Sequence, residues 1–269
     1  MLVSTVVTVV PRRDVTVPAN LGRASYATFL GLVRDSDSAL SERLHEANQM
    51  KPFTVSSLQG VGVVNGEQMA LRKDEEYWLR FTSLDPILSE VLLSGILPNL
   101  PSTISLGRAD YDVIHTTMSQ DAHQWAGTTT YEELVRRSLV EGESATSKIM
   151  LRFLSPTTFR SQDKNVPLPT PDLVFGSLVD KWNAMSGVYL PPQTREFASR
   201  FIAISRFNLR SRVLFSGRYQ HVGCVGNCTY EILAKDPYWI RVVNLLADFA
   251  LYAGVGSKTT VGMGQVRRR

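Results

Sequence analysis

The sequence has little of what would indicate export or a membrane. It holds two cysteines, Cys224 and Cys228, in 269 residues, too few for a disulfide framework, and this favours a reducing compartment. Its longest apolar runs fall well short of the roughly 20 residues that a membrane-spanning helix requires. The amino-terminal run from Leu2 to Val10 predicts a strand, without a basic leader or a cleavage site. We therefore expect a soluble, cytoplasmic protein with no membrane partner.

Acidic residues are scarce in the second half of the chain. Residues 1–150 hold 13 basic and 18 acidic side chains, whereas residues 151–269 hold 16 and 7, so the two halves carry net charges of −5 and +9. Lysines and arginines that neutralise phosphates release condensed counterions on binding. The asymmetry therefore indicates that the second half binds a polyanion, with a merely solvated basic surface as the alternative.

The densest basic stretch runs from residue 195 to residue 218. Its arginines and phenylalanines are Arg195, Arg200, Arg206, Arg210, Arg212, Arg218, Phe197, Phe201, Phe207 and Phe215. Arginine makes forked contacts to phosphate, while the aromatic rings either stack on bases or fill a core. We expect Arg206, Arg210 and Arg212 to contact nucleic acid.

The two halves have similar predicted elements. In the first, we expect strands at 2–10, 53–58, 77–82, 104–106 and 112–117, and helices that begin at Asn20, Asp37 and Asp85. In the second, we expect strands at 147–153, 201–205, 213–219 and 230–233, and helices at 173–182 and 236–254. This order predicts an α+β protein of two tandem ferredoxin-like (RRM-like) domains, residues 1–140 and 147–269, with a linker at 141–146.

The carboxy-terminal segment from residue 254 to residue 264 is rich in glycine. We expect it to bind RNA through Gly254, Gly256, Lys258, Thr259, Gly262 and Gly264, because glycine lets a backbone approach a phosphate closely. A nucleotide-binding P-loop would require glycine at Tyr252 and Ser257, and a dinucleotide fingerprint would require it at Thr259. Neither motif matches. A tight turn between a helix and a strand remains the structural alternative.

Three segments carry a resemblance to a known family. They are the glycine-rich segment, Gly226-Asn227-Cys228-Thr229-Tyr230-Glu231, and Leu44-His45-Glu46-Ala47-Asn48-Gln49-Met50-Lys51-Pro52-Phe53-Thr54-Val55-Ser56. Together, in this order over nearly the whole chain, they resemble the CRISPR-associated precursor-crRNA processing endoribonucleases of the RAMP superfamily. The resemblance implies tandem ferredoxin-like domains and metal-independent cleavage of CRISPR repeat RNA to release guide RNAs.

Metal-independent cleavage of RNA needs groups that move protons, because the nucleophile is the RNA's own 2′-hydroxyl. Histidine suits this task, and His45 lies near the end of a predicted helix, where the helix dipole favours a protonated imidazole. The resemblance identifies His45 as catalytic, with Lys51 beside the developing phosphate charge. It also implies a tyrosine from the preceding helix, for which Tyr26 is the nearest candidate and core packing the alternative role.

A zinc site at His221, Cys224 and Cys228 is disfavoured because no fourth ligand lies at motif spacing. The carboxylates show no paired spacing that a two-metal nuclease would need, so we expect neither a metal nor a cofactor. The expected partner is CRISPR repeat RNA, with other CRISPR effector subunits and a second copy of the chain as further candidates. The alternative function is a non-catalytic RNA-binding RAMP subunit of an effector complex.

Overall fold

The computed structural model describes residues 1–46, 50–141, 145–216 and 219–269. The chain divides by its internal contacts into two compact units. The first contains Met1–Thr128 and Thr260–Gly262, and the second contains Thr129–Thr259 and Met263–Arg269. Across the described ranges, every helix is too short or too polar to cross a bilayer.

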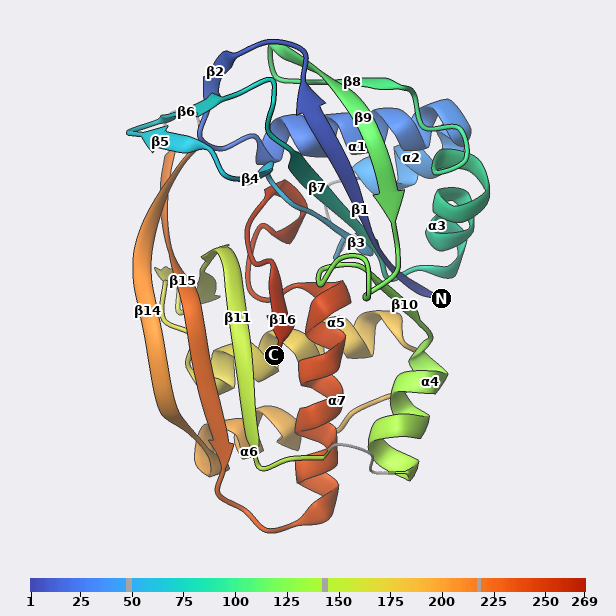
Figure 1. The fold of residues 1–269 in the computed structure, drawn as a ribbon. Coiled ribbons are helices and arrows are strands. Elements are labelled where there is room, and N and C mark those ends of the chain that lie inside the picture. The colour runs from blue at the N-terminus through green and yellow to red at the C-terminus, as the bar shows by residue number, and fades with distance from the viewer. Residues whose placement is uncertain (47–49, 142–144, 217–218) are drawn as a thin grey trace. The chain divides into compact units, whose positions relative to one another are not determined.

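The first unit contains a mixed set of helices and antiparallel strands (Figure 1). Its principal elements are β1 (Leu2–Pro11), α1 (Gly22–Ser36), α2 (Ser38–His45), β3 (Phe53–Val55), β7 (Tyr77–Ser83), α3 (Pro86–Glu90), the π-helical segment η1 (Val91–Ile96), β8 (Thr103–Leu106) and β9 (Ala109–Thr117). Shorter strands are β2 (Val15–Pro18), β4 (Gln59–Gly60), β5 (Val63–Asn65), β6 (Gln68–Leu71) and β10 (Gly127–Thr129). The main sheet has the order β3-β7-β1-β9-β8.

The helices of the first unit pack on this sheet through aromatic side chains. The ring of Phe29 on α1 lies 5.0 Å from that of Phe53 and 5.1 Å from that of Phe81. Asp37 caps α2 as the sequence indicated, since its Oδ1 accepts from the amide of Leu40. The N-cap of α1 is Leu21, one residue later than expected, and Asn20 Oδ1 accepts from the amide of Gly22 in the turn just before it. The position of α2, which carries His45 at its end, therefore follows from local capping and core packing.

The second unit has the same βαββαβ order that β1, α1, β3, β7, α3 and β9 form in the first. Its elements are α4 (Tyr131–Val135), the π-helical segment η2 (Arg136–Val140), β11 (Lys148–Thr157), β12 (Phe159–Ser161), β13 (Lys164–Val166), α5 (Pro171–Met185), α6 (Gln193–Phe201), β14 (Ile202–Ser216), β15 (Tyr219–Ile232), α7 (Pro237–Ala253) and β16 (Val266–Arg268). The strands pair in the order β14-β15-β11-β16. Both units therefore have a ferredoxin-like topology, and the predicted fold class is confirmed.

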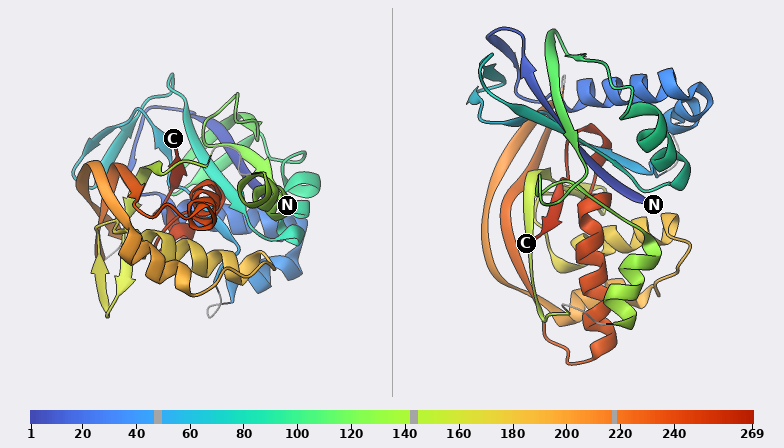
Figure 2. Two further views of the ribbon diagram at one scale, coloured as in Figure 1. Left: turned by 90° about the horizontal axis from the view of Figure 1, so that it is seen from below. Right: turned by 45° about the vertical axis from the view of Figure 1, so that its right-hand side comes forward.

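Helices α5 and α7 lie on the same side of the second sheet (Figure 2). Phe175 of α5 packs against Tyr230 of β15, and Asp248 of α7 pairs with Arg268 of β16. Because side chains alternate along a strand, the neighbours of Tyr230 and Arg268 project from the opposite face. This alternation divides the sheet into an apolar helix-covered face and a polar face.

Three expectations for the second unit were wrong or incomplete. The predicted strands at 201–205, 213–219 and 230–233 are two long strands, β14 and β15. Cys224 and Cys228 lie within β15 and are buried. Helices α4 and α6 and strand β16 were not predicted. Within the expected linker at 141–146, residues 142–144 fall outside the described residues.

Candidate active site and nucleic-acid interface

His45 is the last residue of α2, exposed, with the buried Leu44 before it. The ammonium of Lys51 donates a hydrogen bond to the carbonyl of Glu46, the residue that follows His45. The structure therefore brings the candidate lysine to the exit of the helix that carries the candidate histidine. Residues 47–49 of the connecting segment lie outside the described residues.

Tyr26, on α1, is partly buried. Its ring stacks on that of Phe53, two residues after Lys51, with 6.1 Å between the ring centroids. Burial raises the pKa of Tyr26, which keeps the phenol protonated at neutral pH. In this position the ring of Tyr26 packs against the core, and its protonated hydroxyl can donate a hydrogen bond but cannot act as a base.

The other three histidines have structural neighbours of their own. His115 hydrogen-bonds with Thr8 at 3.3 Å, and the His123 ring lies edge-on to Trp78 with 4.8 Å between centroids. His221 Nε2 lies 2.9 Å from the ammonium of Lys258. Strand alternation places His221 on the opposite face of β15 from Cys224 and Cys228, so these three residues do not converge on a common metal site.

The glycine-rich segment uses much of its backbone internally. Its left-handed glycines include Gly254 (φ 60°), Gly256 (φ 76°), Gly262 (φ 95°) and Gly264 (φ 64°), and Thr259–Val261 forms the 3₁₀ turn η3. The amides of Gly256, Gly262 and Gly264 donate to Ser177 Oγ and to the carbonyls of Val55 and Pro156. Those three amides are therefore engaged by the protein itself, which gives the segment the character of a fixed turn.

A buried lysine holds the start and the middle of the glycine-rich segment. Lys181 Nζ, on α5, donates to the carbonyls of Ala253 at 2.7 Å and Gly254 at 3.2 Å, and it lies 3.5 Å from Thr259 Oγ1. Burial lowers the pKa of Lys181 to about 7. Sequence reasoning missed this residue, because one apolar-flanked lysine in a helix gives no signal of its role.

Arg218 lies outside the described residues, and the other candidate arginines separate into two groups. Arg195 pairs with Asp180, and Arg200 pairs with Glu196, so their charges are neutralised nearby. Arg206, Arg210 and Arg212 are exposed on β14, and their register partners on β15 are Thr229, Val225 and Gly223. All three therefore project from the polar face of the second sheet.

Three further arginines lie on this same face. Arg152 of β11 is in register with Arg267 of β16, and the ladder continues when Arg269 donates its amide to the carbonyl of Met150. Sequence reasoning missed Arg152, Arg267 and Arg269. The run of arginines at positions 267–269 was a visible signal, but only a strand assignment reveals which of its members share a face.

The fold and these surfaces define a tandem ferredoxin-like protein with an arginine-lined sheet. The family model described as the CRISPR Cas6 N-terminal domain matches residues 1–136, and the model described as CRISPR-associated endoribonuclease Cas6 matches residues 151–266. The chain therefore belongs to the Cas6 family of CRISPR-associated endoribonucleases, and the resemblance stated from the sequence is confirmed.

Curated relatives and solved structures agree with this assignment. A CRISPR-associated endoribonuclease Cas6 of Mycobacterium tuberculosis is 30% identical over 123 residues, 45% of this chain and 39% of the relative. One of Streptococcus thermophilus is 26% identical over 117 residues, 43% and 48% of the two chains. These matches span less than half of each relative. A solved Cas6 product complex is 28% identical, with a TM-score of 0.81 over 100% of both chains, and Thermus thermophilus Cas6 is 26% identical, with a TM-score of 0.73 over 100% and 98%.

Proposed function

We propose that this protein is an endoribonuclease that binds CRISPR repeat RNA and cuts it without a metal ion. The 2′-hydroxyl at the scissile position attacks the adjacent phosphate, leaving a 2′,3′-cyclic phosphate on one fragment and a 5′-hydroxyl on the other. Membership of the Cas6 family supports this function, and so does the similarity to a Cas6 solved as a product complex. The observation that carries the catalytic assignment is the contact of Lys51 with the residue after His45.

Each catalytic residue has a proposed role. His45 transfers protons between the 2′-hydroxyl, the leaving 5′-oxygen and solvent, because its exposed imidazole can both accept and donate a proton. Lys51 neutralises charge that develops on the phosphate. Tyr26 acts as a hydrogen-bond donor and not as a base, since burial raises the pKa of its phenol.

The RNA is bound by the second unit and by the glycine-rich segment. Arg206, Arg210 and Arg212 supply exposed guanidinium groups on one sheet face. Lys258 supplies an exposed side chain at the turn. Thr259 is buried beside Lys181 and helps to hold the turn, and Gly254, Gly256, Gly262 and Gly264 give the turn the backbone angles that it requires. Other CRISPR effector subunits, a second copy of the chain and a cytoplasmic location stay predictions.

Incubation of the purified protein with repeat RNA in EDTA tests this function. We expect cleavage in the chelator, with a 2′,3′-cyclic phosphate and a 5′-hydroxyl at the new ends. A single 2′-deoxyribose at the scissile position removes the nucleophile, so it should block cleavage and leave binding intact. Strict dependence on Mg²⁺, or cleavage of the deoxy substrate, would refute the mechanism. Tight binding without products at any metal concentration would support the alternative, a non-catalytic RNA-binding subunit.

A further inference from the structure

The polar face of the second sheet carries a row of side chains that crosses all four strands. Asn208 of β14 is in register with Asn227 of β15, Asn227 with Arg152 of β11, and Arg152 with Arg267 of β16. Adjacent strands lie about 4.8 Å apart, so the row spans roughly 14 Å. Two amide and two guanidinium side chains therefore lie side by side in a row long enough to contact a nucleic-acid strand.

Positive charge is concentrated at the end of the row formed by β11 and β16. Burial lowers the pKa of Arg267, and the nearby positive charges of Arg152 and Arg269 lower it further. The guanidinium group of Arg267 is thus close enough to Arg152 and to Arg269 to be repelled by both. A bound anion would relieve that repulsion and accept their forked hydrogen bonds.

Asn227 adds an acceptor beside these donors. Its Oδ1 atom is buried and has no hydrogen-bond partner among the described residues. A buried carbonyl oxygen left without a donor costs free energy. The row therefore combines groups that attract an anion with an oxygen that is available to accept a hydrogen bond.

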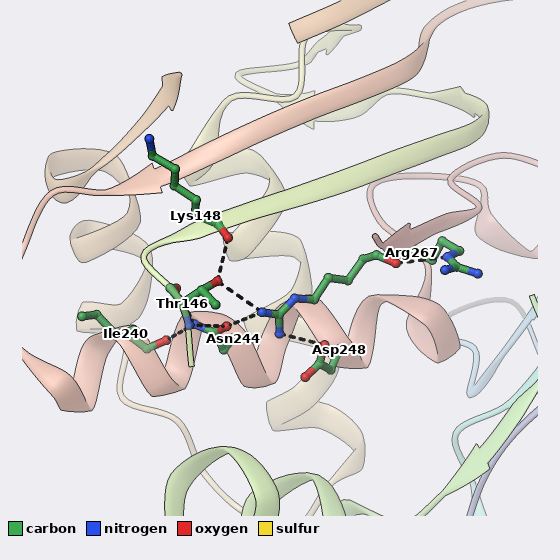
Figure 3. A network of polar contacts seen from close by, with 7 residues as sticks. Thr146, Lys148, Ile240, Asn244, Asp248 and Arg267 are labelled. Atoms are coloured by element: carbon green, nitrogen blue, oxygen red, sulfur yellow. Dashed lines mark hydrogen bonds and ion pairs between the residues drawn. The ribbon is translucent and has the colours of Figure 1, made fainter. Parts of the chain in front are cut away.

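The position of the arginines is fixed from the opposite face of the sheet. Arg268 donates to Asp248 at 3.0 Å and to Asn244 at 2.7 Å, both on α7, and its guanidinium lies 3.4 Å from Thr146 Oγ1 (Figure 3). Because alternate residues of a strand point to opposite faces, holding Arg268 on the helix side directs Arg267 and Arg269 to the polar side. The clamp thereby preorganises the cluster.

We propose that Arg152, Arg267, Arg269 and Asn227 form a ribose-phosphate subsite for RNA, distinct from the candidate catalytic residues. The guanidinium groups bind a backbone phosphate, and Asn227 Oδ1 accepts a hydrogen bond from the 2′-hydroxyl of a neighbouring ribose. The 2′-hydroxyl distinguishes RNA from DNA, so this subsite discriminates between them. The inference rests on the proposed function only for the identity of the ligand as RNA.

The phosphate contact is tested by measuring the affinity for uncleavable repeat RNA at several salt concentrations. The double variant Arg152→Gln/Arg267→Gln should weaken binding about tenfold or more near physiological salt, and should lower the salt slope by about 0.7 for each phosphate that is no longer neutralised. Arg160→Gln is the matched control, since Arg160 is exposed and pairs with Asp163 on β12–β13; it should bind and cleave as the wild type does. Wild-type affinity and slope in a folded double variant would overturn the subsite.

The ribose contact is tested with Asn227→Ala and with RNA and DNA of the same sequence. Removing one hydrogen bond should reduce the preference for RNA about fivefold, while the affinity for DNA stays nearly constant. Asn65→Ala, at an exposed position on β5, is the control. An unchanged preference in folded Asn227→Ala would remove the ribose contact from the proposal. If the wild type binds through these residues but never cleaves, the proposed function fails and the subsite stands. If the wild type cleaves and the variants bind RNA normally, the proposed function stands and the subsite fails.

Discussion

Lys181 Nζ donates a hydrogen bond to the carbonyl of Ala253 at 2.7 Å, which links the middle of α5 to the last residue of α7. The same ammonium contacts Gly254 and Thr259. One buried amine therefore joins three oxygen atoms at the junction between α7 and the glycine-rich segment. This arrangement makes the stability of the second unit sensitive to pH.

The first prediction concerns that pH dependence. Burial lowers the pKa of Lys181 to about 7 from an ordinary value of 10.5, so between these pH values the unfolded chain binds more protons than the folded chain. The free energy of unfolding should then rise with pH across this window, by up to about 1.4 kcal/mol per pH unit from this residue. Lys181→Met removes this contribution.

Urea unfolding of the wild type and of Lys181→Met at pH 7, 8, 9 and 10 measures the effect. The difference in unfolding free energy between the two proteins should grow in favour of the wild type as pH rises. Other titrating groups, including Cys224, whose pKa burial raises to about 12, cancel in the comparison. Parallel curves would show that Lys181 does not change its protonation on folding.

The second prediction concerns His45. His45→Ala should slow single-turnover cleavage by at least about 10²-fold, as expected for a residue that transfers protons, with nearly normal RNA affinity. His115→Ala is the control, because His115 hydrogen-bonds with Thr8 within the first unit. Cleavage at the normal rate by His45→Ala would move the proton transfers to another group.

The third prediction concerns Tyr26. The change Tyr26→Phe keeps the ring that stacks on Phe53 and removes only the hydroxyl. If Tyr26 donates a hydrogen bond in the reaction, the single-turnover rate should fall about tenfold while the melting temperature stays near the wild-type value. An unchanged rate would assign Tyr26 to core packing alone. Lys51→Ala, measured alongside, should slow the reaction less than His45→Ala does.

The sequence predicted those elements whose ends depend on local chemistry. Asp37 and Asp236 accept hydrogen bonds from the first turns of α2 and α7, and Gly254 ends α7 with φ 60°. These caps need no tertiary information. The same locality explains why His45 was correctly expected near a helix end.

The full length of β15 was missed because its glycines, Gly223 and Gly226, suggested a turn. Glycine is instead needed at both positions because a neighbouring strand leaves no room for a side chain. A Cβ at Gly226 would lie 2.1 Å from the carbonyl oxygen of Asn208, and one at Gly223 would lie 2.6 Å from the amide nitrogen of Thr157. Such contacts depend on the pairing of distant segments. The sequence therefore located the basic stretch but could not assign its arginines to one face, which left Arg152 and Arg267 unrecognised.

The fourth prediction separates charge from shape in the glycine-rich segment. Lys258→Ala should weaken RNA binding and lower the salt slope by about 0.7, because one phosphate is no longer neutralised. Gly256→Val should weaken binding at every salt concentration, since Gly256 has φ 76° and its Cβ would lie 2.4 Å from the carbonyl oxygen of Thr158. Binding isotherms at several salt concentrations, with circular dichroism to confirm folding, distinguish the two effects. Unchanged affinity in both folded variants would leave the segment a structural turn only.

The last prediction concerns the clamp between Arg268 and Asp248. Burial raises the pKa of Asp248, and Arg268 opposes that effect. In Arg268→Gln the carboxylate loses its cation, so near pH 7 the free energy of unfolding should fall by about 1 to 2 kcal/mol, a modest value because the pair is partly exposed. Removing the cation raises the pKa of Asp248 further, so the destabilisation should shrink as the pH falls and the carboxyl takes up a proton. The second change Asp248→Asn removes the uncompensated charge and should restore part of the loss at pH 7. Unfolding curves for the two single variants and the double variant at pH 7 and pH 4 measure the coupling. Equal losses of unfolding free energy in Arg268→Gln at both pH values, without recovery in the double variant, would show that Arg268 stabilises β16 by packing and not by its charge.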